Sequence, residues 1–186
     1  MKKSQNSIIE TTKLWVERFV IGLNLCPFAR HPFRTNKIEY LVFEGDNQEN
    51  LTERLVMEVN RLLETTPSVL ETTLIILPDM LADFDEYLDY LEVVEFIMSE
   101  LELEGLVQVA SFHPDYQFED TDPSDVENFT NRSPFPMLHL LREDSVERAI
   151  EAFPEVGDIP SRNIETMKNL GFDHVNKMFN DFRKPH

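Results

Sequence analysis

The chain has 186 residues, of which 41% are hydrophobic and 28% are charged, a composition typical of a globular domain. This length suits one α/β domain spanning residues 1–186 with a sizeable buried core. No apolar run approaches the ~18 residues of a membrane span, no signal-peptide pattern follows the basic start, and the single cysteine excludes an internal disulfide, so we predict a cytoplasmic protein.

The net charge of −18 is unevenly distributed. Between Arg61 and Arg132 there is no lysine or arginine, and this stretch holds 18 of the 35 acidic residues. Nucleic acid and an anionic membrane surface are therefore unsuitable partners, because both require basic faces. Two interpretations remain open: a solvated helix face that keeps the protein soluble, or a docking surface for a basic protein partner on an acidic helix at 83–104.

The N-terminal segment predicts an amphipathic helix. Ser7-x-x-Glu10 forms a capping box, and apolar residues then recur at helical spacing from about Ile8 to Leu25. Pro27 cannot continue this helix, which places Cys26 at its exit, and residues 27–36 are expected to form a loop.

The rest of the chain alternates strands with helices. Strands are predicted at 38–43, 72–77, 106–112 and 137–141, and helices at about 47–62, 84–101, 144–153, 160–170 and 173–182. This order favours a mainly parallel four-stranded sheet with helices on both faces and a helical C-terminus. The fourth strand follows a loop of about 23 residues, a length typical of functional or disordered loops, and we expect it to return as an antiparallel edge strand.

Several polar residues are expected at the carboxyl ends of the strands, where open α/β sheets bind ligands. His113 ends the third strand, and an antiparallel fourth strand would start at the same edge. The predicted ligand-binding residues there are Asn131, Arg132, Ser133, Arg162 and Asn163. Two arginines, two amides and a helix start suit a small anion, since arginine binds carboxylate or phosphate bidentately.

Each of these residues also has a structural interpretation. Arg132 and Arg162 could pair with nearby acids such as Asp115 or Glu119, and the acidic surroundings would repel an anion. His113 could transfer a proton, or it could simply hydrogen-bond the loop that follows it. His139, inside the fourth strand, is expected to be structural.

Cys26 is a candidate catalytic nucleophile with two objections against it. A helix C-terminus raises the pKa of a thiol, and the loop after Cys26 leads to the edge of the sheet opposite His113. There are two alternatives: Cys26 is a buried core residue, or it acts as a thiol-based or metal sensor. Two metal sites can be considered: zinc on Cys26, His31 and His113, and calcium on the loop at 120–131. Neither set has the ligand spacing that its metal requires, so we predict no metal site. The sequence assigns no cofactor.

Five segments together resemble an uncharacterised bacterial family, a domain of unknown function of about this length. They are Thr12-Lys13-x-Trp15-Val16-Glu17, Gly22-Leu23-Asn24-Leu25-Cys26-Pro27-Phe28-Ala29, Ser111-Phe112-His113-Pro114, Asn131-Arg132-Ser133-Pro134-Phe135-Pro136 and Ile159-Pro160-Ser161-Arg162-Asn163. The resemblance implies a single stand-alone bacterial domain and supplies no roles for individual residues.

The leading hypothesis is a small-molecule protein that binds an anionic metabolite at the His113 edge. Arg132 and Arg162 would clamp the anion, and His113 would move a proton if the protein is an enzyme. A non-catalytic acidic adaptor and a sensor based on the thiol of Cys26 are the alternatives. An adaptor should present a flat acidic or apolar patch, whereas an enzyme should present a concave pocket.

Overall fold

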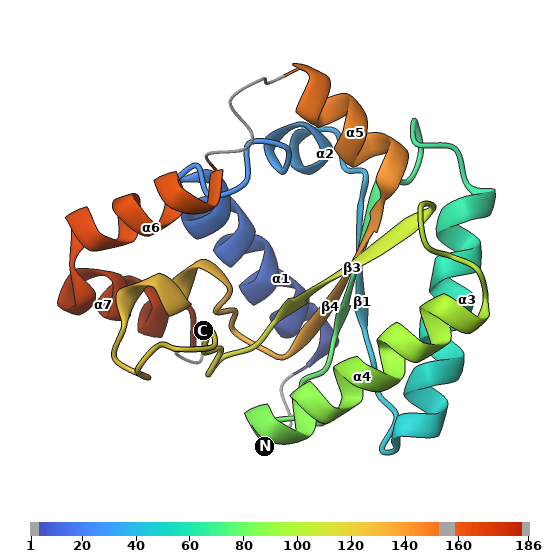
Figure 1. Ribbon diagram of the computed structural model, residues 1–186, viewed down its shortest axis with the longest axis horizontal. Helices are drawn as coiled ribbons and strands as arrows, with labels where there is room; N and C mark the ends of the chain where they lie inside the picture. Colours follow the sequence, from blue (N-terminus) through green and yellow to red (C-terminus); the bar gives the residue numbers. More distant parts are fainter. Residues whose placement is uncertain (1–3, 153–158, 184–186) are drawn as a thin grey trace.

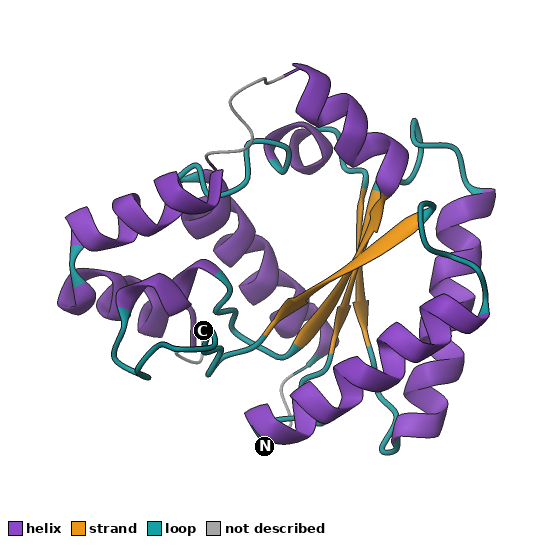
Figure 2. Cartoon of the chain, viewed as in Figure 1, coloured by secondary structure: helices purple, strands orange, loops and turns teal. Residues whose placement is uncertain are grey.

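The computed structural model describes residues 4–152 and 159–183, which form a four-stranded sheet with helices on both faces (Figures 1 and 2). The strands are β1 (Ile38–Val42), β2 (Thr72–Ile76), β3 (Val107–Phe112) and β4 (Met137–Arg142). The helical elements are α1 (Gln5–Trp15), the π-helix η1 (Val16–Ile21), α2 (Arg30–Arg34), α3 (Gln48–Glu64), α4 (Phe84–Glu100), the 3-10 helix η2 (Val126–Thr130), α5 (Glu143–Ala152), α6 (Ile159–Leu170) and α7 (Phe172–Arg183). No helix of the described part of the chain is long and apolar enough to cross a membrane.

The sheet is mixed, with the order β1-β2-β4-β3. Only β1 and β2 form a parallel pair, while β4 lies between β2 and β3 and is antiparallel to both. The prediction of a mainly parallel sheet is therefore wrong. The fourth strand does pair antiparallel with the third, but it is central rather than at the edge. Its almost wholly apolar composition suits this central position, where both faces of the strand are covered.

Each face of the sheet carries its own apolar core. Ile75, Leu138 and Leu140 face α3 and α4, while Leu74 and Met137 face the side covered by α1 and α7. All five residues of β2 are buried, as its apolar run without alternation predicts. Figure 1 shows α3 and α4 on one side of the sheet and α1, α6 and α7 on the other.

Local signals are confirmed within a few residues. Asn47 caps α3 by accepting a hydrogen bond from the backbone of Asn50 at 2.8 Å. The residue of positive φ just past α4 is Glu102, at +53°, rather than the predicted Gly105, which lies farther along the chain. The N-cap of α1 is Ser4 rather than the predicted Ser7. The predicted loop at 27–36 contains the short helix α2, and the predicted end of α5 at Phe153 lies outside the described residues.

Candidate functional site

His113, the centre of the predicted site, is completely buried with both ring nitrogens engaged. Nε2 donates to the carbonyl oxygen of Leu81 at 3.0 Å, and Nδ1 accepts from the backbone N–H of Asp115 at 3.0 Å. The ring packs against both Phe84 and Tyr87, whose centroids are each 5.1 Å from that of His113. Burial lowers the pKa of His113 because it removes water from the charged form. This arrangement has the features of a structural histidine and leaves neither nitrogen free for proton transfer.

Asn131 and Ser133 do meet His113, as predicted, but through the backbone. The His113 N–H donates to the carbonyl of Asn131 and the Ser133 N–H donates to the carbonyl of His113, both at 3.3 Å. The Ser133 hydroxyl donates to the carbonyl of Phe135 at 2.6 Å, and the Asn131 amide donates to the carbonyl of Ser111 at 3.3 Å. These bonds close the two ends of the long loop, and we call this set, residues 111–115 with 131–135, the His113 clasp.

The guanidinium of Arg132 is directed into the same loop. Its Nε donates to the carbonyl of Tyr116 at 3.1 Å, and a terminal nitrogen donates to the carbonyl of Pro123 at 2.9 Å. It also lies 4.5 Å from the centroid of the Phe129 ring, a cation–π geometry. Burial lowers the pKa of Arg132. Arg132 therefore stabilises the loop, and it does so with the N–H donors that an anion clamp would need.

Arg162 and Asn163 lie in the first turn of α6, and Asn163 reaches a different part of the chain. Its side-chain amide donates to the carbonyl oxygen of Leu25 at 2.8 Å. Leu25 directly precedes Cys26, so this bond holds the segment that carries the only thiol. Two of the distinctive sequence segments are thus joined, away from the His113 clasp.

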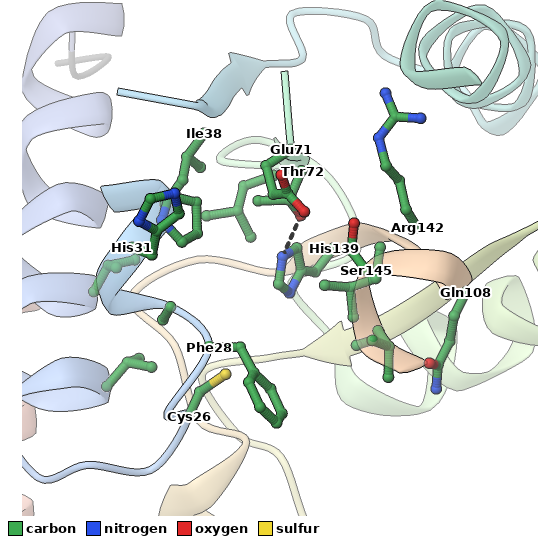
Figure 3. A pocket seen from close by; sticks show the side chains of 18 of the residues that line it. Cys26, Phe28, His31, Ile38, Glu71, Thr72, Gln108, His139, Arg142 and Ser145 are labelled. Carbon is green, nitrogen blue, oxygen red and sulfur yellow. Dashed lines mark hydrogen bonds between the residues drawn. The ribbon is translucent and has the colours of Figure 1, made fainter. Parts of the chain in front are cut away.

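A pocket of about 700 Å³ lies between this Cys26 segment and the α1 side of the sheet (Figure 3). A volume of this size suits a small organic molecule. Its walls are mostly apolar. The apolar lining residues are Trp15, Val16, Val20, Pro27, Phe28, Ala29, Pro32, Ile38, Leu74, Ala110, Phe112, Leu141 and Val146.

The floor of the pocket is built by the register of three strands. His139 of β4 lies between its partners Leu74 on β2 and Ala110 on β3, and Thr72 pairs with Leu141. Alternate residues of a strand point to the same face, so these side chains all face the pocket. The small side chain of Ala110 leaves open the space beside His139, whose Nε2 is 2.7 Å from the hydroxyl of Thr72. Desolvation lowers the pKa of His139 to about 4.

The opposite wall comes from the N-terminal helix and the turn that follows it. Trp15 is 2% exposed and packs edge-on against Phe112 with centroids 5.5 Å apart. The chain then passes through the π-helix η1, a form often found near functional sites, whose residues Val16 and Val20 also line the pocket. The helical run ends at Ile21, and a turn with Asn24 at a φ of +56° leads to Cys26, which lines the pocket.

Cys26 lines the pocket together with His139, so the fold brings the thiol to a histidine other than the predicted one (Figure 3). As the connectivity argument expected, it lies at the edge of the sheet opposite the His113 clasp, where β1, β2 and β3 begin. Burial raises the pKa of the Cys26 thiol, and this effect exceeds the lowering caused by hydrogen bonds from the backbone of Phe28 and Ala29. The resting side chain is therefore a neutral thiol.

Exposed polar residues mark the mouth of the pocket. His31, Gln108 and Arg148 line it and are exposed, and Arg148 donates to the hydroxyl of Ser145 at 3.0 Å. Arg142 also lines the pocket, but it is 8% exposed and donates to the carbonyl oxygens of Leu62, Thr65 and Leu70. Arg142 thus anchors the end of α3, whereas Arg148 is placed to contact a ligand.

The sequence interpretation missed Thr72 and Arg148 and took His139 for a structural residue. A signal for His139 does exist in Met137–Arg142, where one polar residue interrupts an apolar strand at an alternate position. His139 was interpreted as structural because it lies within a strand, and the sequence did not indicate that a pocket lies over this part of the sheet. Thr72 carries no comparable signal, since threonine is common in strands.

The donors of the site do not form a metal centre of the usual kind. Within residues 4–152 and 159–183, no three histidine, cysteine, aspartate or glutamate side chains gather closely enough to hold an ion. Cys26, His31 and His139 all line the pocket, yet they are spread over its walls.

The chain belongs to the family described as Protein of unknown function (DUF1415), whose family model matches residues 7–177. The predicted membership of an uncharacterised family of about this length is thereby confirmed. No curated protein and no solved structure matches the chain. The family description names no activity, so the functional argument depends on the geometry of the pocket.

Proposed function

We propose that the protein binds a small, mostly apolar organic molecule in the pocket between the Cys26 segment and the sheet. The observation that carries this proposal is a cavity of about 700 Å³ with largely apolar walls and a polar mouth. Ligand sites commonly have this character: apolar walls supply affinity and a few polar groups fix orientation. The apolar body of the ligand would lie over Ala110 and Leu74, beneath Phe28.

The anionic group of the ligand would bind at the mouth of this pocket, and not at the His113 clasp where the sequence predicted it. Arg148 is exposed there, and its guanidinium is 3.0 Å from the hydroxyl of Ser145, which suits a carboxylate or a similar group. Arg132 is not part of this proposal, because its donors are committed to loop carbonyls. Nucleophilic catalysis by Cys26 is also left out, because burial keeps the thiol protonated.

Two fluorescent dyes provide a direct test. N-phenyl-1-naphthylamine is apolar and uncharged, whereas 1-anilinonaphthalene-8-sulfonate has a similar body with an anionic group. Both should bind the native protein, and Ala110→Phe should weaken both by at least about tenfold by filling the pocket. Ala82→Phe, at an exposed loop position, is the matched control and should leave binding unchanged.

Arg148→Ala should weaken binding of the sulfonate dye by about threefold to tenfold and leave binding of the neutral dye unaffected, as expected for a charge at the rim.

Chemical protection of Cys26 gives an independent check. Cys26 is the only cysteine, so bound dye should slow its alkylation by N-ethylmaleimide in native protein. Dye binding that Ala110→Phe leaves intact would contradict the proposal.

A second candidate function rests on the outer face of α4. Phe96 is 62% exposed, Leu88 and Val93 are exposed beside it, and acidic residues surround them without a single lysine or arginine on the helix. The charge complement of this face is a cationic amphipathic segment of a partner protein. A synthetic lysine–leucine helix should bind in a salt-dependent manner and lose affinity with Phe96→Ser, whereas the control Ile150→Ser on α5 should have no effect. Equal binding by both variants would exclude this surface.

A further inference from the structure

The hydroxyl of Thr72 determines which nitrogen of His139 carries the proton. Its oxygen lies 2.6 Å from the carbonyl oxygen of Leu140 and 2.7 Å from Nε2 of His139. A carbonyl oxygen can only accept a hydrogen bond, so the single hydroxyl proton of Thr72 is donated to Leu140. Nε2 of His139 must then donate to the Thr72 oxygen, which fixes the proton on Nε2.

Nδ1 of His139 is consequently an unprotonated acceptor. Among the residues that the structure describes, it has no hydrogen-bond partner. In Figure 3 this second nitrogen lies on the side of the ring towards Cys26 and Phe28, within the pocket. Because desolvation keeps the pKa of His139 at about 4, the imidazole is neutral at physiological pH and the lone pair persists.

A second unsatisfied group belongs to a residue that lines the same pocket. The indole nitrogen of Trp15 has no partner within the described part of the chain, but protein atoms enclose it, so the pocket is lined by the ring of Trp15 and not by this N–H. Phe112 connects the two groups, since its centroid lies 5.5 Å from that of Trp15 and 6.1 Å from that of His139. The mostly apolar floor of the cavity therefore presents one unpaired acceptor, Nδ1 of His139. Buried polar groups without partners are unfavourable, so a ligand that pairs with them gains affinity and selectivity.

We propose that the ligand carries a neutral hydroxyl group on its apolar body and that this hydroxyl donates a hydrogen bond to Nδ1 of His139. The inference rests on the proposed binding function and names the class of ligand: an alcohol or phenol. A carboxylate at this depth is unsuitable, because it offers no proton and would place its charge beside the imidazole lone pair. Thr72 is a positioning residue that acts through His139.

Matched probes separate hydroxyl recognition from simple apolar binding. Octan-1-ol and 1-methoxyheptane have the same number of carbon and oxygen atoms, but only the alcohol can donate a hydrogen bond. Each would be used to displace N-phenyl-1-naphthylamine from wild-type protein, with octanoate as the anionic comparison. We expect the alcohol to bind about tenfold more tightly than the ether, as one buried hydrogen bond allows.

Two variants test the assignment to His139. His139→Leu should reduce the preference for the alcohol to less than about twofold, while His174→Leu, at an exposed position on α7, should retain it. Thr72→Val should also reduce the preference, because the proton is then free to move to Nδ1. The adjacent Thr73→Val, which makes the same substitution but removes a hydroxyl without a partner among the described residues, is the matched control and should retain the preference.

The outcomes distinguish this inference from the proposed function. If the dye binds and Ala110→Phe abolishes its binding, but alcohol and ether displace it equally, the pocket stands and hydroxyl recognition is overturned. Tighter binding of octanoate than of octan-1-ol to Arg148→Ala, which lacks the cationic group of the mouth, or no displacement by either neutral probe, overturns it as well. If Ala110→Phe does not affect dye binding, the proposed function itself fails.

Discussion

Two histidines, His113 in the clasp directly after β3 and His139 in the pocket within β4, have opposite surroundings. His113 is completely buried and uses both nitrogens within the protein, one on a carbonyl and one on a backbone N–H. His139 uses only Nε2, and its other nitrogen faces a cavity. The comparison shows that a histidine at a strand end is not evidence of a site until the partners of both its nitrogens are known.

The largest expected effect comes from breaking the clasp. His113→Leu leaves the carbonyl of Leu81 and the N–H of Asp115 without partners in a buried region, so the free energy of unfolding should fall by about 3 kcal/mol. Urea denaturation provides the measurement. The exposed control His174→Leu should stay within about 0.5 kcal/mol of wild type. Folded His113→Leu should bind the dyes with the affinity of wild type. A loss of dye binding without a loss of stability would show that His113 belongs to the binding site.

Acid should destabilise the protein through His139. Above pH 6.5 this side chain is neutral in both states; below that value the unfolded chain takes up a proton that the folded protein does not bind until about pH 4. The free energy of unfolding should therefore fall by about 2–3 kcal/mol between pH 6.5 and pH 4 on account of His139.

Urea denaturation at pH 7.5 and pH 4.5 checks this expectation. His139→Leu should lose that part of the acid sensitivity, whereas His174→Leu should keep it. His113 also has a lowered pKa and contributes in the same direction, so the decisive quantity is the difference between each variant and wild type. Identical acid losses in wild type and His139→Leu would show that the imidazole is well solvated.

Two neighbouring threonines offer a smaller and sharper comparison. Thr72 donates to Leu140 and accepts from His139, whereas the hydroxyl of Thr73 is buried without a partner among the described residues. Thr72→Val should cost about 1–2 kcal/mol of stability, and Thr73→Val should be neutral or stabilising by up to about 1 kcal/mol. Thermal unfolding of the two variants side by side is the measurement. Equal effects would contradict the hydrogen-bond assignment.

The smallest effect is expected at the anchor of the Cys26 segment. Asn163→Ala removes the amide that donates to the carbonyl of Leu25, which should cost about 1 kcal/mol. Since the segment would then open more often, Cys26 should react faster with N-ethylmaleimide in native protein. Asn180→Ala, which removes an exposed amide on α7, is the control and should leave the rate unchanged. An unchanged rate in Asn163→Ala would show that this bond does not hold the thiol in place.

The distinctive sequence segments marked structurally important positions better than they marked chemistry. The segments around His113 and Asn131 meet as predicted, but their polar atoms are used within the clasp. The segments around Cys26 and Asn163 also meet, through a bond to Leu25 that spacing alone could not indicate. A side chain that closes a loop and one that binds a ligand have the same sequence signal, because both require a specific polar group at a fixed place.

The sequence by itself determined the elements, the single thiol, the acidic middle third and the family. Apolar periodicity and caps act over a few residues, which is why the four strands and the main helices lie close to their predicted positions. Only the tertiary structure decided that β4 enters between β2 and β3, because strand order depends on long-range pairing that local pattern does not encode. That insertion places His139 beside Ala110 and opposite Cys26, and it thereby moved the candidate site from one end of the sheet to the other.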